Sequence, residues 1–294
     1  MTKATLAQAL ECLGLEICTE AVETRGASGA GVHRVRAGSE DAVLKVTGSD
    51  ESRELARREL TFYRTMAGRM PISTPRLLRS LDDEHVTALL LTAHRPSPPA
   101  REWDLAAWLD LASQLAVLHA LPIPSENHWL GTSWLSQALN QPSSADGYWF
   151  KTSAADSARL ALRHTGELAD ALRSTGDCFV HGDCHVENLL REGNELVWAD
   201  WQNVGVGSPA GELAFLWSRA DADGAEVPYD AMLDVYLSYR EADPVQLRRA
   251  LIAAELGILL FGWPAHAAYC APAVQERLAR RLVQLTDRWL SGAT

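Results

Sequence analysis

The chain has 294 residues, of which 47% are hydrophobic, and its formal net charge at pH 7 is -11. A chain of this length forms either one large domain or two smaller ones around a sizeable core. Its negative charge repels phosphate backbones, which disfavours a nucleic acid as partner and favours a cationic ligand. The alternative explanation is that the acidic surface serves only solubility.

The chain contains five cysteines: Cys12, Cys18, Cys178, Cys184 and Cys270. Their odd number and irregular spacing argue against a disulfide framework, and reduced thiols are typical of cytosolic proteins. The N-terminus lacks the charged and apolar segments of a signal peptide, so we expect a cytoplasmic location. The longest apolar stretch, residues 251–263, is interrupted by Glu255 and is too short to span a membrane.

The first part of the chain alternates short strands and turns with two helices. Five segments have the apolar patterns of strands: 16–24, 32–36, 42–46, 75–80 and 86–92. Helices are expected over 5–13 and 51–66, the second because it is dense in Glu, Arg and Leu and lacks Gly and Pro. A glycine-rich turn at 25–31 separates the first two strands. These elements predict a β-meander.

A proline-rich segment at 94–99 separates this part from a helical remainder, so we predict an α+β protein with two lobes, 1–93 and 94–294. Five segments of the second lobe are expected to be helical: 105–118, 152–174, 230–239, 245–263 and 274–290. The segment 122–149 is rich in Ser, Asn, Pro and Trp, which predicts a loop that acts as a lid or faces a substrate. The two lobes would enclose a cleft.

The most informative stretch is HGDCHVENLL, residues 181–190. Phosphoryl transfer needs a carboxylate that orients the acceptor hydroxyl, oxygen ligands for Mg²⁺ and a cation on the nucleotide phosphates. Asn188 lies five residues after Asp183, and Asp200 follows twelve residues later at the end of a predicted strand. A short hairpin would bring Asn188 and Asp200 to one metal ion. The spacing therefore predicts a phosphoryl-transfer loop.

Zinc binding is the rival interpretation of the same stretch, because Cys178, His181, Cys184 and His185 form a dense cluster. Structural zinc sites usually draw their ligands from two separated knuckles, whereas these four residues lie in one run. In the phosphoryl-transfer interpretation the two cysteines are small fillers, and His181 supports the loop through hydrogen bonds.

The stretch HGDCHVENLL, followed by WADWQNVGVGSPAGELAF, resembles the aminoglycoside phosphotransferase and choline kinase-like families. Asp200 and Trp201 match the families' Asp-Trp motif, residues 207–214 match Gly-x-Pro-x-x-(Asp/Glu)-Leu-Ala, and residues 115–119 match a Leu-Ala-x-Leu-His helix end. The resemblance implies a bilobal protein-kinase-like fold. The N-lobe would hold a small antiparallel sheet and one helix, and the C-lobe would be mainly helical.

The resemblance also implies a role for each matched residue. Asp183 would be the catalytic aspartate, with His181 beside it, and Asn188 and Asp200 would hold Mg²⁺. Lys45, flanked by apolar residues in Val-Leu-Lys-Val, would contact the phosphates of ATP, with GTP as the alternative nucleotide.

Nucleotide binding would involve further residues of the N-terminal lobe. Glu59 is the expected helix partner of Lys45, and Glu54 is the alternative. Two segments would contact the nucleotide: the turn around Ser28, Gly29 and Gly31, and the hinge at Thr92, Ala93 and His94. The glycine order departs from Gly-x-Gly-x-x-Gly, but backbone N–H groups there could still cradle phosphates.

The resemblance implies that the acceptor would be a small molecule with a hydroxyl group, and the net charge favours an aminoglycoside or another cationic antibiotic. Its candidate contacts are Trp149, Asp177, Trp201, Trp217, Glu255 and Trp263. Glu255 lies in an apolar run, so its carboxylate needs a partner, either a ligand group or an internal salt bridge. The aromatic residues could instead suit a nucleoside, a peptide-like antibiotic or a quaternary amine through stacking or cation–π contact. The alternative acceptor is a choline-, sugar- or nucleoside-type metabolite.

Two other classes remain open. A protein kinase is disfavoured because Asp-Trp replaces Asp-Phe-Gly and no Ala-Pro-Glu segment follows. A catalytically silent kinase-fold binding protein is disfavoured by the intact set Lys45, Asp183, Asn188 and Asp200. The expected partners are thus a nucleotide, Mg²⁺ and a small hydroxyl acceptor, with no nucleic acid or membrane, for a monomer or homodimer.

Overall fold

The computed structural model describes residues 3–17, 24–25, 30–48, 50–125, 129, 133–142, 147–267 and 269–292. The chain forms two compact units, Met1–Ser97 with Asn188–Val204, and Pro98–Glu187 with Gly205–Thr294. The predicted lobes, 1–93 and 94–294, stay a prediction, and the compact units place residues 188–204 with the first part of the chain. None of the helices in the described part of the chain has the length and apolar character needed to cross a membrane.

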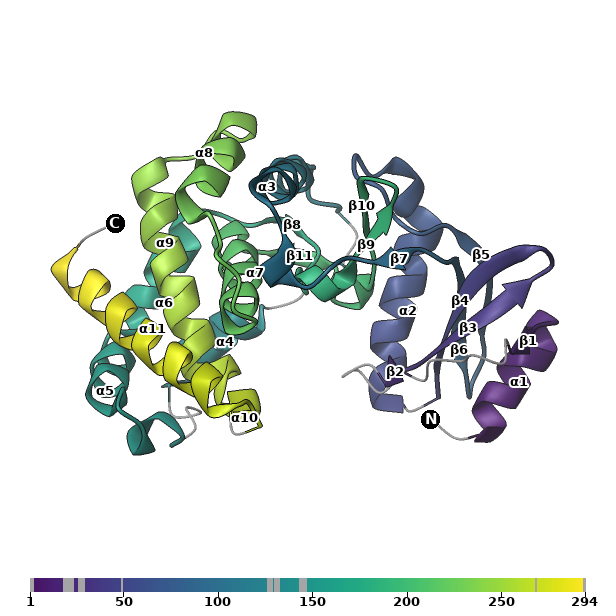
Figure 1. Cartoon of the computed structure of the whole chain (residues 1–294), viewed down its shortest axis with the longest axis horizontal. Coiled ribbons are helices and arrows are strands. Elements are labelled where there is room, and N and C mark those ends of the chain that lie inside the picture. Colours follow the sequence, from purple (N-terminus) through teal and green to yellow (C-terminus); the bar gives the residue numbers. More distant parts are fainter. Residues whose placement is uncertain are drawn as a thin grey trace. The chain divides into compact units, whose positions relative to one another are not determined.

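The described residues of the first unit form an antiparallel sheet and the helices α1 and α2 (Figure 1). Its helices and sheet strands are α1 (Lys3–Leu13), β1 (Glu16–Ile17), β2 (Thr24–Arg25), β3 (Gly31–Ala37), β4 (Glu40–Thr47), α2 (Asp50–Thr65), β5 (Leu77–Asp82) and β6 (Thr87–Thr92). The strands are ordered β1-β3-β4-β6-β5, and β2 also pairs with β3. The predicted α+β fold with a small antiparallel sheet is confirmed. The predicted strand 16–24 and glycine turn lie largely outside the described residues.

Strand β4 shows why the sheet has two different faces. Ala42, Leu44 and Val46 are buried in a core cluster together with Ala9 and Leu13 of α1. Side chains alternate along a strand, so Lys45 points to the opposite face. The sequence pattern of β4 therefore places Lys45, which lies between apolar residues, on the face of the sheet opposite to the core cluster.

A three-stranded sheet in the order β10-β9-β7 completes the first unit; its strands are β7 (Arg95–Pro96), β9 (Leu189–Glu192) and β10 (Glu195–Trp198). A two-residue turn containing Gly193, whose φ is 60°, joins β9 to β10. The backbone N–H of Ala199 donates to the carbonyl of Asn188 at 2.9 Å. The hairpin thus brings the segments that carry Asn188 and Asp200 side by side.

The second unit is mainly helical (Figure 1). Its elements are α3 (Leu105–His119), α4 (Trp134–Asn140), α5 (Ala155–Arg163), α6 (Thr165–Ser174), β8 (Cys178–Val180), β11 (Gly205–Gly207), α7 (Pro209–Ala222), α8 (Tyr229–Tyr239), α9 (Pro244–Gly257), α10 (Pro264–Ala267) and α11 (Pro272–Ser291). Strands β8 and β11 pair antiparallel. Helix α9 packs against α6, α7 and α11 and forms the centre of the unit.

Three predictions for this unit, one of a loop and two of helices, need correction. The predicted loop 122–149 contains α4, whose Leu135 and Leu139 are buried. Its seven residues give too short an apolar pattern to recognise, and packing against α6 and α9 supports the helix. The predicted helix 152–174 is divided into α5 and α6, and 245–263 ends in a π-helical turn, Ile258–Gly262.

We expect Gly257→Ala to destabilise the second unit. A Cβ atom at Gly257 would lie 2.6 Å from Cδ1 of Leu135 and 3.4 Å from Cδ2 of Leu139. Overpacking of this kind costs about 1–3 kcal/mol, which exceeds the gain of up to about 1 kcal/mol in helix propensity. Calorimetry should therefore show a lower Tm.

Gly166→Ala is the matched control, because nothing lies within 4 Å of its added Cβ in α6. Its Tm should stay equal or rise. An unchanged Tm for Gly257→Ala would show that α4 is not packed against Gly257 as described.

Candidate active site

A buried lysine between two carboxylates is the central feature of the first unit. Nζ of Lys45 lies 2.6 Å from Oε2 of Glu59 and 2.8 Å from Oδ1 of Asp200. The side chains of Lys45 and Glu59 are 12% and 2% exposed, and that of Asp200 is 30% exposed. Glu54, the alternative partner of Lys45, is exposed. The structure thus pairs Lys45 with Glu59.

The helical spacing of α2 explains the position of Glu59. Ala56, Glu59, Leu60 and Tyr63 are buried, and residues three, four and seven positions apart lie on one face of a helix. Glu59 therefore points inward with its apolar neighbours, while Glu54 lies outside this face. A buried carboxylate needs a cation, and Lys45 supplies it.

The three charges shift one another's ionisation. Burial lowers the pKa of Lys45, but the attraction of Glu59 and Asp200 outweighs this effect and leaves the pKa raised. Burial raises the pKa of Glu59, and the Lys45 ammonium opposes that rise. Lys45 is therefore held as a cation. Of its two carboxylate partners, that of Asp200 is still partly open to solvent.

Backbone geometry and an aromatic contact position Asp200. Its φ of 65° and ψ of 57° are left-handed, a conformation that Asp adopts more readily than most residues. The following residue, Trp201, is fully buried and stacks on Phe62 of α2 at a centroid distance of 4.1 Å. Its indole N–H donates to the carbonyl of Trp198 at 2.7 Å. Helix α2 thus fixes both partners of Lys45.

Asn188 and Asp200 fit a hard divalent cation. Both belong to the segments joined by the Ala199 to Asn188 hydrogen bond, and they offer an amide oxygen and a carboxylate. Mg²⁺ is commonly held by one or two such protein oxygens together with phosphate oxygens. Asn188 and Asp200 are therefore residues that could hold Mg²⁺ on a nucleotide.

The loop after β8 carries the other predicted catalytic residues, in the second unit. Asp183 is half-buried, and its Oδ1 lies 3.7 Å from Nε2 of His185. The N–H of Asp183 donates to Nδ1 of the buried His181 at 3.3 Å. Gly182 between them has a φ of 83°, a conformation that favours glycine. The loop turns sharply and leaves the Asp183 carboxylate partly accessible.

Glu212 of α7 anchors this loop. Its Oε1 accepts from the N–H of Gly182 at 2.6 Å, and its Oε2 accepts from the N–H of His181 at 3.2 Å. Oε2 also lies 2.8 Å from Nε2 of His119, at the end of α3. Burial alone would raise the pKa of Glu212, but the His119 contact and the backbone donors lower it. Glu212 therefore remains an anion that holds the loop backbone.

A hydrogen-bonded chain continues from His119 to Arg240, the C-cap residue of α8. Nδ1 of His119 lies 2.8 Å from the hydroxyl of Tyr236, which accepts from Nη1 of Arg240 at 2.7 Å. Burial raises the pKa of Tyr236, partly offset by Arg240. Residues from α3, α7 and α8 thus hold the backbone of the loop that carries Asp183 through a chain of hydrogen bonds.

The zinc interpretation finds no support in this geometry. Burial raises the pKa of Cys178 to about 12 and that of Cys184 well above its ordinary value, so both remain protonated thiols. Among the described residues, which include all four members of the cluster, no group of three or more His, Cys, Asp and Glu side chains could hold a metal ion.

The remaining nucleotide predictions, which stay predictions, concern the glycine turn and the hinge. Ser28 and Gly29 lie outside the described residues, and Gly31 begins β3, where it pairs with Val46. At the predicted hinge, the N–H of Ala93 donates to the carbonyl of Asp41 at 3.3 Å. Within the same segment, Oγ1 of Thr92 lies 2.9 Å from Nε2 of His94. In this structure that N–H and both side chains are engaged within the protein.

Most of the predicted acceptor contacts have packing roles. Trp149 and Trp263 are buried, and their indole N–H groups donate at 2.7 Å to the carbonyl of Leu259 and the hydroxyl of Ser218. Trp201 stacks on Phe62, and Trp217 packs edge-on against Tyr229. Asp177 is exposed. These positions give the aromatic residues partners inside the protein.

Glu255 forms an internal salt bridge, one of the two kinds of partner that the sequence left open for its carboxylate. Its two carboxylate oxygens accept from Nε and Nη2 of Arg281 at 2.6 and 2.8 Å. Glu255 is 3% exposed. A bidentate guanidinium compensates the buried charge of this glutamate.

Several residues of the site were not singled out from the sequence. Glu212 and His119 lie inside the two quoted motifs, so motif spacing could have identified them. Tyr236, Arg240 and Arg281 belong to no motif, and only their packing against α3, β8 and α9 reveals them. Phe62 likewise could not be distinguished from any other apolar residue of α2.

A family model described as the phosphotransferase enzyme family matches residues 24–269. No curated protein matches the chain in a sequence search. Among solved structures, an amicoumacin kinase in complex with AMP-PNP, Ca²⁺ and its ligand is similar with a TM-score of 0.65 and 12% identity, over 98% of this chain and 94% of that one.

Two further solved structures are similar. A macrolide 2'-phosphotransferase from Brachybacterium faecium has a TM-score of 0.64 and 19% identity, over 96% of this chain and 98% of that one. An aminoglycoside phosphotransferase from Streptomyces rimosus, in complex with ADP and streptomycin, has a TM-score of 0.56 and 19% identity, over 87% and 99%. These low identities establish a shared fold. The match over residues 24–269 establishes that the chain belongs to the phosphotransferase enzyme family.

Proposed function

We propose that the protein transfers the γ-phosphoryl group of ATP to a hydroxyl group of a small molecule. The observation that carries the proposal is the Lys45 ammonium held between Glu59 and Asp200 at 2.6 and 2.8 Å. A lysine on a strand, paired with a helix glutamate beside a metal-binding aspartate, is the arrangement on which kinases rely to bind nucleotide phosphates. GTP is the alternative donor.

Asp183 is proposed to act on the acceptor. Its carboxylate would take the hydroxyl proton as the acceptor oxygen bonds to the γ-phosphorus. The bond from that phosphorus to the bridging oxygen breaks, and the nucleoside diphosphate leaves with the electron pair. Glu212 supports this role because it holds the backbone N–H groups of His181 and Gly182.

The first unit is proposed to bind the nucleotide and its metal ion. Lys45 would donate to phosphate oxygens, and Asn188 and Asp200 would offer oxygens to Mg²⁺. When bound, Mg²⁺ supplies positive charge that neutralises the phosphate oxygens. Glu59 would keep Lys45 oriented while Asp200 offers an oxygen to Mg²⁺, because the Glu59 carboxylate is buried and bonded to Nζ.

For the acceptor, we propose an aminoglycoside or another cationic antibiotic, which suits the net charge of -11. The similar structures include kinases named for aminopropanol and ethanolamine, so an amino-alcohol metabolite is the second candidate. A screen of hydroxyl-bearing antibiotics and metabolites with ATP and GTP, read by a mass gain of one phosphate group, separates the two. Phosphate incorporation into proteins alone would contradict both.

We expect Asp183→Asn to reduce kcat by roughly 10²-fold or more, because the amide cannot accept the hydroxyl proton. Nucleotide affinity, measured by calorimetry, should stay unchanged. Asp234→Asn, an exposed substitution with the same charge change on α8, is the control and should keep full kcat. Full kcat in Asp183→Asn would remove this residue from the mechanism.

We expect Lys45→Met to lower kcat by roughly 10²-fold, the loss seen when one preorganised electrostatic contact is removed. It should also lower the Tm, since Glu59 is left buried without its cation. Adding Glu59→Gln to Lys45→Met should restore much of the Tm and none of the activity. Lys151→Met, at an exposed position, is the control. Wild-type activity in the Lys45→Met variant would disprove the role of Lys45.

We expect Asp200→Asn to weaken Mg²⁺-dependent binding of ATP by about tenfold or more, because an amide is a poorer Mg²⁺ ligand than a carboxylate. Asn tolerates the left-handed backbone of this position, so the fold should be retained. Calorimetric titrations of ATP with Mg²⁺ and with a chelator provide the measurement. Equal affinities of wild type and variant under both conditions would argue against metal binding at Asp200.

A further inference from the structure

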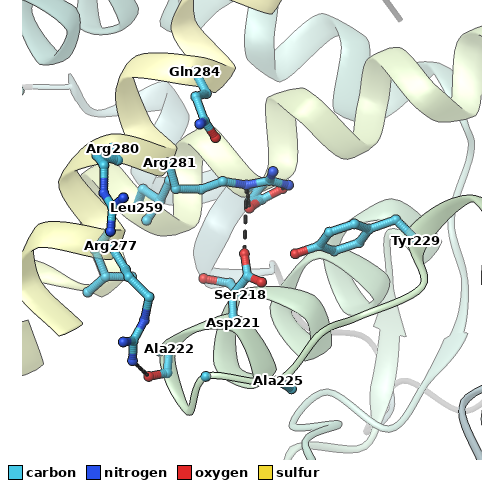
Figure 2. Close-up of a pocket in the computed structure, with 13 residues that line it drawn as sticks. Ser218, Asp221, Ala222, Ala225, Tyr229, Leu259, Arg277, Arg280, Arg281 and Gln284 are labelled. Atoms are coloured by element: carbon cyan, nitrogen blue, oxygen red, sulfur yellow. Dashed lines mark hydrogen bonds and ion pairs between the residues drawn. The ribbon is translucent and has the colours of Figure 1, made fainter. Parts of the chain in front are cut away.

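The second unit contains a cavity of about 320 Å³ that the proposed mechanism does not use. It is lined by the C-terminal end of α7, the start of α8, the end of α9 with its π-helical turn, and one face of α11 (Figure 2). Figure 2 shows Arg281 and Tyr229 reaching it from opposite sides. None of the residues 181–188 of the loop lines this cavity.

One face of α11 supplies most of the charge in the cavity. Arg277, Arg280, Arg281 and Gln284 all line it. Positions three, four and seven residues apart share a face of a helix, so the four side chains form one stripe. Each carries N–H groups, and three of the four are guanidiniums.

The lining has more cations than anions. Its carboxylates are Glu255 and Asp221. Arg281 is compensated by Glu255 at 2.6 Å and lies 3.9 Å from Asp221. Arg277 and Arg280 remain, so three guanidiniums face two carboxylates. This local excess of positive charge contrasts with the net charge of -11 for the chain.

Arg277 is held in place with one donor unused. Its Nη2 donates to the carbonyl of Ala222, in the last turn of α7, at 2.7 Å. Its Nε is buried and has no hydrogen-bond partner within the described part of the chain. A buried guanidinium N–H without an acceptor is costly, so the described part of the chain leaves the donors of Arg277 incompletely matched.

The π-helical turn Ile258–Gly262 is a second, independent feature of the cavity wall. It contributes Leu259 to the lining. The indole N–H of Trp149 donates to the carbonyl of Leu259 at 2.7 Å. Isolated π-helical turns within α-helices occur frequently at functional sites, because they widen the helix and displace its side chains.

We propose that this cavity binds the acidic group of a small molecule, a carboxylate or a phosphate, through Arg277 and Arg280. Guanidinium groups bind both kinds of oxyanion with two parallel N–H donors, which suits Arg at such a site. Gln284 provides a further donor, and the apolar surfaces of Leu259 and Leu278 accommodate the carbon skeleton. The anion belongs either to a separate effector or to an acceptor that, unlike an aminoglycoside or an amino-alcohol, carries an acidic group.

The test is a titration of the full chain with inorganic phosphate and with succinate, observed through the tryptophan indole resonances in NMR spectra. Trp217 is the reporter, because its ring lies 5.0 Å from that of Tyr229 in the cavity wall. Trp217→Phe assigns its signal. We expect a saturable shift of this signal at millimolar concentration with at least one of the two probes.

Arg280→Gln should weaken that binding by about fivefold or more, the loss of one exposed charged contact. Arg280 is exposed, so the fold should be unaffected. Arg163→Gln, an exposed substitution on α5 with the same charge change, should leave the affinity unchanged. No saturable shift with either probe, or equal weakening by both variants, would overturn the proposal.

A kinetic arm distinguishes the two sources of the anion. If the probe raises KM for the acceptor without changing kcat, the cavity receives the acidic group of the acceptor. If the probe changes kcat and does not raise KM for the acceptor, the anion is a separate effector. The binding arm needs no turnover, so it decides the anion site even if the proposed phosphoryl transfer fails.

Discussion

The ammonium of Lys45, bonded to two carboxylates in buried surroundings, is the interaction on which the first unit depends. A buried charge is tolerated only when it is paired, and removing one partner of such a pair typically costs about 3–5 kcal/mol. Strand β4, helix α2 and the turn at Asp200 must therefore keep a fixed mutual arrangement. The stacking of Trp201 on Phe62 serves the same end, since it ties the residue after Asp200 to the helix that carries Glu59.

An equivalent principle organises the second unit. Glu212 is a buried anion that three groups compensate: the backbone N–H groups of His181 and Gly182, and the ring of His119, which is itself bonded to Tyr236. Its position near the start of α7 makes the helix a support for the loop that carries Asp183. At the other end of the same helix, Asp221 and Ala222 border the arginine-rich cavity. One helix thus joins the supporting structure of the loop to the proposed anion site.

Several parts of the fold followed from sequence patterns, and others could not. The strand that carries Lys45 was predicted from its apolar pattern, whereas the packing of α1 on the sheet shows that Lys45 lies on the face opposite to the core cluster. The spacing from Asn188 to Asp200 predicted their hairpin, because it depends only on neighbouring residues. The choice between Glu59 and Glu54 depended on which face of α2 meets the sheet. Helix α4 was missed because its stability comes from packing on α6 and α9, and Glu255 kept two explanations until α11 placed Arg281 beside it.

The sequence by itself determined the fold class, the family resemblance and the loop around HGDCHVENLL, since these rest on local spacing and periodicity within short segments. Only the tertiary structure decided which charges meet: Lys45 with Glu59 and Asp200, Glu212 with His119, and Glu255 with Arg281. The physical reason is that each pair joins elements that are distant along the chain, and no pattern within one segment specifies its partner. The same holds for the cavity beside α11, whose excess of guanidinium groups arises from helices brought together by folding.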